Sequence, residues 1–228
     1  FGKFASYYIR GEYFFDVHPP LGKLIFAGVA KLFAYDGWFS FDKIGTNYTG
    51  ANVPYIAMRS ISALCNVLTV SLIYAMLVEM KFSLAATIIG TCCVLFDNAL
   101  VTQSRFILLD AQLILFITCS CYCWIRFRQL TKSAFLPAWW MWLTLTGVSL
   151  GLAVGVKFVG LFVVFLIGSC TLYDLWDLCR PERTPNIRVW FYHWIARIIC
   201  LIIVPLAVFI IPYYLHFAIL NKSGTGDE

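Results

Sequence analysis

A few ionisable side chains interrupt the apolar segments of this 228-residue chain. Asp97, Arg105, Asp110 and Lys157 lie within or between apolar runs, and Arg59 directly precedes one. A charged group at the centre of a bilayer costs about 2.5–3.5 kcal/mol on insertion scales, so each position needs a reason. Cations gathered at a membrane boundary can bind a lipid-borne phosphate, because arginine offers a planar fork of donors and lysine a point charge.

These residues also have structural interpretations. Asp110 follows Arg105 by five residues, so the two could form an ion pair at a helix end. Arg59 could be an interfacial anchor whose aliphatic stem covers apolar surface. Lys157 could mark a tight turn, and His18 could be a turn residue before two prolines.

The composition requires a membrane as solvent. The chain is 61% hydrophobic and 13% charged, whereas soluble domains have about 45–50% apolar and about 25% charged residues. A disordered chain, a collagen, a coiled coil and a soluble globular domain are excluded. The sequence has no glycine-rich phosphate loop, HExxH, GxSxG or zinc spacing, so we expect no metal, no cofactor and no nucleic-acid partner.

Apolar runs predict an all-α integral membrane protein, since a membrane helix needs about 20 apolar residues. Residues 60–217 are expected to form six spans, following a luminal loop over 1–59 and preceding a luminal tail over 218–228. The expected spans are 60–78, 82–104, 106–125, 135–156, 158–173 and 198–215.

The distribution of basic residues predicts the orientation. Segments 79–83, 126–136 and 177–192 together hold seven Lys and Arg, whereas the opposite short turns hold three. The positive-inside rule then makes the richer side cytosolic. Glycosylation sequons at Asn47 and Asn221 fall on the other side, which indicates a secretory-pathway membrane.

The first loop is expected to hold two amphipathic interfacial helices. Pro19 and Pro20 can open the second, since proline in the first turn loses no needed N–H. From Leu21 to Phe33 apolar residues recur with helical spacing, and Lys23 falls on the opposite side of that stripe. The aromatic segment 4–15 favours the headgroup level in the same way.

Several motifs resemble the protein O-mannosyltransferase family, which uses dolichyl phosphate mannose. The motifs are DVHPPLGK over 16–23, SRFILLD over 104–110, VGVKFVGLF over 154–162 and the tail NKSGTGDE, and the resemblance extends along the whole chain. The forms NALVTQSR and WWMWLTLTGV are most similar to the animal type 1 branch.

The resemblance implies a GT-C-type multi-helix bundle in the endoplasmic reticulum membrane, with its active site at the luminal face. It implies inverting transfer of mannose from dolichyl phosphate to Ser or Thr of acceptor proteins, by a dimer with a related subunit. A MIR region would follow the tail. The family's acidic pair, which supplies the general base, would precede Phe1, so we expect a fragment that is inactive alone.

By the same resemblance, Arg59 matches the family's functionally important arginine and is the first candidate for the phosphate, followed by Arg105 and Lys157. Asp16 matches the DVHPP aspartate and is assigned a supporting catalytic role. His18 and Lys23 are further candidates near the headgroup.

Two other functions stay open. One is another polyprenyl-phosphate-sugar transferase with a glycan acceptor. The other is a non-catalytic membrane subunit or transporter. Transporters tend to have repeats and broken helices at the midplane, whereas this sequence shows no repeat and its charges gather at one face.

Overall fold

The computed structural model describes residues 1–41, 43, 45–48, 51–180 and 186–227. Within these ranges the structure is helical, apart from loops and one isolated β-bridge. The elements are α1 (Gly2–Arg10), α2 (Leu21–Leu32), α3 (Tyr55–Glu79), α4 (Leu84–Leu95), α5 (Asn98–Gln103), α6 (Asp110–Gln129), η1 (Thr131–Ser133), α7 (Pro137–Val156), η2 (Phe158–Gly160), α8 (Leu161–Leu178), α9 (Ile187–Ile198), η3 (Ile199–Ile203) and α10 (Val204–Ile219).

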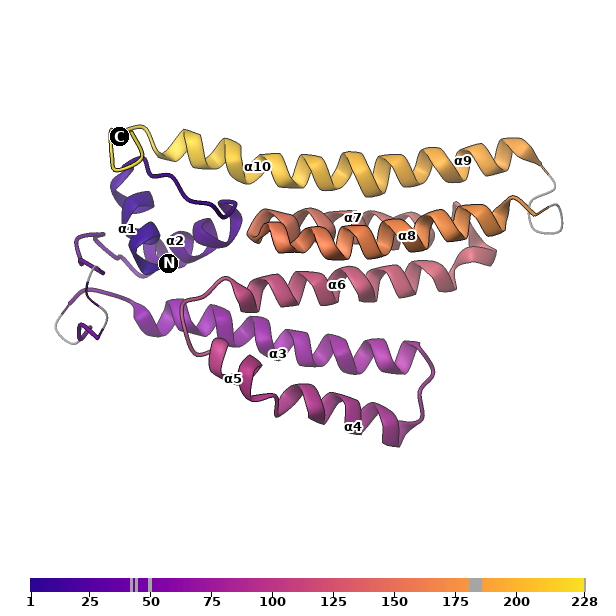
Figure 1. The fold of residues 1–228 in the computed structure, drawn as a ribbon, viewed down its shortest axis with the longest axis horizontal. Coiled ribbons are helices and arrows are strands. Elements are labelled where there is room, and N and C mark those ends of the chain that lie inside the picture. Colours follow the sequence, from indigo (N-terminus) through magenta and orange to yellow (C-terminus); the bar gives the residue numbers. More distant parts are fainter. Residues whose placement is uncertain (42, 44, 49–50, 181–185, 228) are drawn as a thin grey trace.

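The long helices run side by side in an elongated bundle, and α1 and α2 gather at one end of it (Figure 1). Helix α6 packs between α3 and α7, and α7 also packs against α10. The chain therefore brings the starts of α3 and α6, the ends of α7 and α10, and both short helices to one place. We call this the α1–α2 end, and the opposite one the far end.

All six expected apolar segments contain helix. Within the described residues, four helices are long and apolar enough to cross a membrane: Tyr55–Glu79, Pro137–Val156, Phe158–Leu178 and Ile187–Ile219. Outward-facing side chains such as Phe162 and Phe165, each 77% exposed, are apolar, as a lipid-facing surface requires. The number of crossings stays a prediction.

The expected single helix over 82–104 is wrong. It divides into α4 and α5, and Asp97 lies at the break. The carboxylate of Asp97 accepts a hydrogen bond from the backbone N–H of Leu100 at 2.8 Å. Asp97 is therefore an N-cap, which satisfies a backbone donor that the start of a helix leaves unpaired.

The last helix, formed by α9, η3 and α10, contains the π-helical turn η3 where it packs closely against α7. A Cβ added at Gly147 would collide with the carbonyl of Cys200, and one at Gly151 would come 2.6 Å from the carbonyl oxygen of Pro205. Pro205 has no N–H to donate to the preceding turn, and η3 ends two residues before it. Two glycines and a proline thus fix how α7 meets α10.

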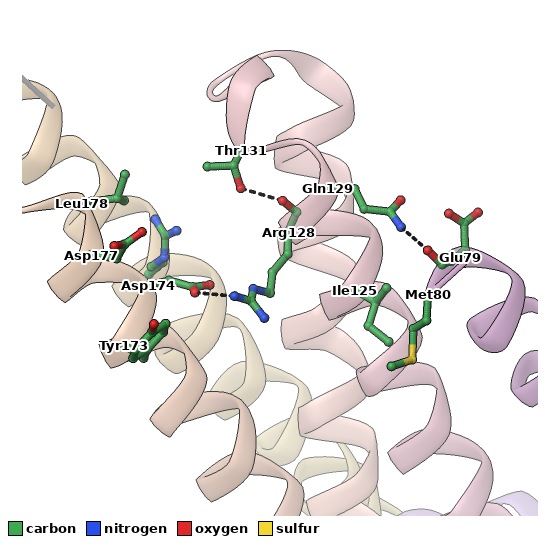
Figure 2. Close-up of a pocket in the computed structure, with 11 residues that line it drawn as sticks. Glu79, Met80, Ile125, Arg128, Gln129, Thr131, Tyr173, Asp174, Asp177 and Leu178 are labelled. Atoms are coloured by element: carbon green, nitrogen blue, oxygen red, sulfur yellow. Dashed lines mark hydrogen bonds and ion pairs between the residues drawn. The ribbon is translucent and has the colours of Figure 1, made fainter. Parts of the chain in front are cut away.

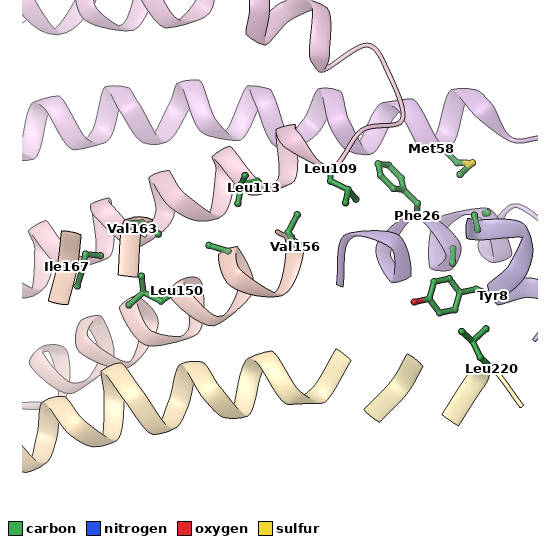
Figure 3. Close-up of a cluster of buried hydrophobic side chains, with 14 of the residues drawn as sticks. Tyr8, Phe26, Met58, Leu109, Leu113, Leu150, Val156, Val163, Ile167 and Leu220 are labelled. Atoms are coloured by element: carbon green, nitrogen blue, oxygen red, sulfur yellow. The ribbon is translucent and has the colours of Figure 1, made fainter. Parts of the chain in front are cut away.

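The buried core continues from the bundle into the α1–α2 end (Figure 3). Leu150, Val163 and Ile167 lie within the bundle, and Phe26 and Met58 extend the cluster under α2. Helix α2 is thereby attached firmly to the helices it covers.

Helix α2 begins directly after Pro20, as predicted, and it is the face opposite much of the predicted apolar stripe that packs against protein. Its buried residues are Gly22, Lys23, Phe26, Ala27 and Ala30. Leu32 and Phe33, which belong to the predicted apolar stripe, are 84% and 61% exposed. In a membrane interface the apolar stripe can face lipid, so the small and polar residues pack against protein.

Candidate functional site

Asp16 and Lys23 form a buried ion pair at the α1–α2 end. The Lys23 ammonium donates to the Asp16 carboxylate at 2.7 Å and to the His18 carbonyl at 2.7 Å. Lys23 is 2% exposed and lies over the rings of Phe4 and Phe14. Burial lowers the pKa of Lys23 from its usual value, and the bond to Asp16 opposes this change. Asp16 therefore holds a basic group in place.

A second ion pair joins α6 to the end of α7. The Lys157 ammonium donates to the carboxylate of Asp110 at 2.8 Å, and both side chains are partly buried. The expected pair between Asp110 and Arg105 is wrong, because Asp110 pairs with Lys157 instead, and Arg105 lies exposed in the irregular segment before α6. Lys157 ends the antiparallel neighbour of α6 and so lies level with its first residue.

The start of α2 lies between these two ion pairs. A Cβ added at Gly22 would lie 2.6 Å from the Leu109 side chain, 2.8 Å from Gln112 Oε1 and 3.4 Å from the Val156 side chain. Gly22, Leu109 and Val156 directly precede Lys23, Asp110 and Lys157, respectively. Close approach at a glycine therefore brings both pairs into one neighbourhood.

Arg59 occupies a separate cavity of about 370 Å³ beside the first turn of α3. Its guanidinium carbon lies 5.9 Å from the ring centre of Tyr48 and 5.4 Å from that of Tyr55, and its Nε is buried without a hydrogen-bond partner. Lys3 and Lys43 also line the cavity, and its described lining includes no acidic side chain. This cavity is suited to an anion.

The candidate residues thus lie at one end of the bundle but not in one cavity. Arg59 lines the cationic cavity, whereas Asp16, Arg105 and Lys157 are absent from its described lining. Asn47 and Asn221 are exposed at the same end; Thr49, which completes the sequon at Asn47, lies outside the described residues.

Sequence reasoning missed two features of this end. Lys3 and Lys43 carry no helical periodicity relative to Arg59, so spacing could not bring them together. His216 belongs to no motif in the sequence, yet it is buried and its Nδ1 lies 2.6 Å from the Tyr8 hydroxyl. Burial raises the pKa of Tyr8, so its hydroxyl stays protonated at neutral pH.

The C-terminal tail docks onto the segment that holds Asp16. Glu12 and Lys222 form a parallel bridge, in which Tyr13 N–H donates to the Lys222 carbonyl at 2.9 Å. Gly224 and Gly226 lie against the backbone of Tyr13 to Phe15, where a Cβ would clash. The tail therefore supports the backbone directly before Asp16.

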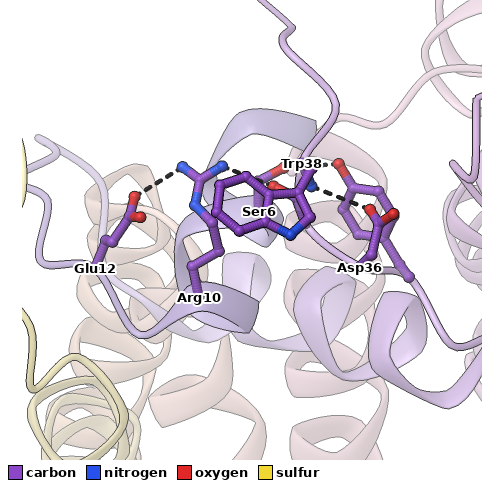
Figure 4. A network of polar contacts seen from close by, with 7 residues as sticks. Ser6, Arg10, Glu12, Asp36 and Trp38 are labelled. Atoms are coloured by element: carbon purple, nitrogen blue, oxygen red, sulfur yellow. Dashed lines mark hydrogen bonds and ion pairs between the residues drawn. The ribbon is translucent and has the colours of Figure 1, made fainter.

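A neighbouring polar network closes the outer side of α1 (Figure 4). Arg10 donates to the Glu12 carboxylate and to the Gly37 carbonyl, each at 2.7 Å, and its guanidinium lies over the Trp38 ring. These contacts tie the first loop to α1.

The far end has a different character. A cavity of about 450 Å³ lies there, and its polar groups pair with one another (Figure 2). Arg128 donates to Asp174 at 2.9 Å, and Gln129 donates to the Glu79 carbonyl at 2.8 Å. Among the described residues, no group of three or more His, Cys, Asp and Glu could hold a metal at either end.

These features define a multi-pass helical membrane protein with a cationic site at one end. A family model described as dolichyl-phosphate-mannose-protein mannosyltransferase matches residues 1–221, so the chain belongs to that family. The expected GT-C-type fold is confirmed: the solved complex entitled "Structure of S. cerevisiae protein O-mannosyltransferase Pmt1-Pmt2 complex bound to the sugar donor" superposes with a TM-score of 0.93 at 37% identity, covering 99% of this chain and 30% of that one.

Two curated relatives show how widely the similarity extends. Dolichyl-phosphate-mannose-protein mannosyltransferase 4 of Candida albicans is 44% identical over 227 residues, 100% of this chain and 30% of the relative. Protein O-mannosyl-transferase 1 of Mus musculus, from the animal type 1 branch, is 35% identical over 230 residues, 100% of this chain and 31% of the relative. The chain thus spans about 30% of the length of these relatives.

Proposed function

We propose that this chain is the donor-binding part of an enzyme that transfers mannose from dolichyl phosphate mannose to Ser or Thr hydroxyls of secretory-pathway proteins. The reaction takes place at the luminal face of the endoplasmic reticulum membrane. The family assignment supports this proposal, and so does the similarity to a solved complex that was bound to the sugar donor.

The observation that carries the proposal is the cationic cavity of Arg59. Transfer with inversion needs a base for the acceptor hydroxyl, cations for the departing phosphate and two substrates held in line. Arg59, with a buried and unpartnered Nε, is the candidate for the phosphate. The base is expected from the family's acidic pair before Phe1.

The other candidates take more modest roles. Lys157 keeps donors beyond the one it gives to Asp110, and exposed Arg105 can approach a headgroup from outside the bundle. Asp16 orients Lys23, and His18 accepts from Lys23 through its backbone. We propose that these five residues support the donor headgroup at the α1–α2 end, and that Arg59 holds the charge that develops on the phosphate.

The proposed partners are Ser- or Thr-containing acceptor proteins, the lipid donor and a related mannosyltransferase subunit. The similar structure is a complex of two proteins, Pmt1 and Pmt2, which supports such a pairing. A transferase that uses lipid-linked glycans as acceptors is the alternative, and an assay offering peptide and glycan acceptors side by side separates the two.

Replacement of Arg59 in the full-length enzyme tests the proposal. Arg59→Ala should lower mannosyl transfer by about 10²–10³-fold, the usual effect of removing one donor from an anionic transition state. Arg59→Lys should retain part of the activity because it keeps the charge. Transfer from labelled donor to an acceptor peptide is measured in membranes. Lys31→Ala, which removes an exposed basic residue of α2 outside the cavity, is the control.

Near-normal turnover of Arg59→Ala at saturating donor would contradict the assignment. Equal loss in the Lys31→Ala control would show that net luminal charge, not the cavity, is what matters. The folded fraction is followed by gel filtration so that misfolding is not scored as lost chemistry.

A further inference from the structure

An apolar groove lies between α8 and the α9–η3 segment. Its volume is about 370 Å³. Phe165, Gly168 and Leu172 of α8 line one side, and Ile198 and Ile202 line the other. Phe165 is 77% exposed and Ile202 is 61% exposed, so the groove opens toward the membrane rather than into the core.

Two buried hydrogen-bond donors without partners lie at one end of this groove. Arg197 is 6% exposed, and its Nη1 bonds to His193, but its Nε has no partner. Trp194 Nε1 is likewise buried without a partner. The carboxylate of Asp174, in the adjoining cavity, accepts from Arg128 instead. Buried donors are normally paired, so two of them at one site indicate a missing acceptor.

The groove passes from headgroup depth into the hydrocarbon. The last apolar run begins at Ile198, directly after Arg197, so Arg197 lies at the predicted cytosolic boundary. Tryptophan rings favour the same headgroup depth, which suits Trp194. At about 1.5 Å per residue, Ile202 lies roughly 7–8 Å deeper. The antiparallel α8 places Phe165 deeper than Leu172 on the opposite wall.

We propose that this groove binds an anionic phospholipid of the cytosolic leaflet. The lipid phosphate accepts hydrogen bonds from Arg197 Nε and Trp194 Nε1, and one acyl chain lies between α8 and η3. Both groups need an acceptor, and the positive charge of Arg197 favours one that is an anion. The apolar walls suit a hydrocarbon chain behind it. Basic residues of the far end attract anionic headgroups, and π-helical turns often occur at functional sites.

Photolabelling of the full-length enzyme tests this site independently of its catalytic activity. The enzyme is reconstituted in phosphatidylcholine vesicles that contain phosphatidylserine with a diazirine in its acyl chain. After irradiation, mass spectrometry should locate label on peptides from α8 and α9–η3. Phosphatidylcholine carrying the same diazirine has the same phosphate, but its choline cation offsets that charge and the lipid is net neutral, so it should label these peptides about tenfold less.

Gly168→Leu is the decisive variant because a Cβ at Gly168 meets nothing within 4 Å. The leucine should fill the groove and lower labelling about tenfold, the effect of excluding roughly two methylene groups. Gly28→Leu, at another helical glycine with open space, should label normally. Arg197→Lys keeps the charge but removes Nε, so it should reduce the preference for phosphatidylserine.

Three results would overturn the proposal. Equal labelling of the wild type and Gly168→Leu would show that the chain does not enter the groove. Equal labelling by the two lipids would show that the site does not select a net anionic headgroup, which contradicts an anionic phospholipid as the occupant. A melting temperature lowered by Gly168→Leu but not by Gly28→Leu would show that another protein segment fills the groove.

Discussion

At the scale of single residues, the α1–α2 end combines charges of two kinds. Lys23 and Lys157 are paired with carboxylates, whereas Arg59 keeps a buried donor without a partner. A paired cation positions backbone and neighbours, and an unpartnered one can receive a ligand. This difference, and not the count of positive charges, separates positioning residues from candidates for the donor phosphate.

The pair between Asp16 and Lys23 should be asymmetric. Asp16→Asn leaves a 2% exposed ammonium without its counter-ion, and breaking such a pair costs about 3–5 kcal/mol. Lys23→Met leaves a carboxylate that is 15% exposed and better hydrated, so it should cost less. Thermal unfolding of the purified full-length enzyme measures both. The double variant should be more stable than Asp16→Asn, and additive losses would argue against a coupled pair.

Sequence patterns predicted helical elements better than side-chain partners. Hydrophobic runs located the long helices because lipid and core both select apolar residues, although the last helix begins at Ile187, before the run predicted from residue 198. For the same reason the sequence does not show which face of α2 packs against protein, since an apolar stripe can face either lipid or the protein core. Asp97 showed no sign of being a cap, and Lys157 reached Asp110 only through the antiparallel packing of α7 on α6. Contacts between distant segments depend on packing, which local periodicity does not contain.

At the scale of elements, the tail acts as a support for the segment before Asp16. Gly224→Ala should displace the tail, because a Cβ there would meet the backbone of Tyr13 rather than a flexible side-chain end. Hydrogen exchange of the Tyr13 and Lys222 amides, both bonded across the bridge, should become faster. Mannosyl transfer should fall in parallel.

Gly28→Ala is the matched control for the tail. Its Cβ meets no atom within 4 Å, and alanine is favoured over glycine in a helix by about 1 kcal/mol. Exchange at Tyr13 and Lys222 should stay unchanged in this variant. Unchanged exchange in Gly224→Ala as well would mean that the tail is held by other contacts.

At the scale of the whole molecule, the two ends have separate chemistry, and the predicted orientation assigns them to separate compartments. The α1–α2 end holds the cationic cavity and both exposed sequon asparagines, and the far end holds charge pairs such as Arg128 with Asp174. The α1–α2 end can bind the donor phosphate during transfer only if it faces the compartment where donor and acceptor meet. The proposed function therefore requires one orientation of the bundle, with the Arg59 cavity on the side of the membrane where the acceptors are.

This orientation predicts opposite accessibility of Cys179 and Asn221. Cys179 is a free, exposed cysteine at the far end, so a membrane-impermeant maleimide should modify it in sealed microsomes, and Cys179→Ala should remove that label. Asn221 should carry a glycan, so Asn221→Gln should remove one endoglycosidase-sensitive shift on a gel. Ser223→Cys, in the exposed tail, should react only after permeabilisation. If Cys179 instead requires permeabilisation while Ser223→Cys reacts directly, the bundle is inverted, and the Arg59 cavity faces the cytosol, away from the acceptors on which the proposed function depends.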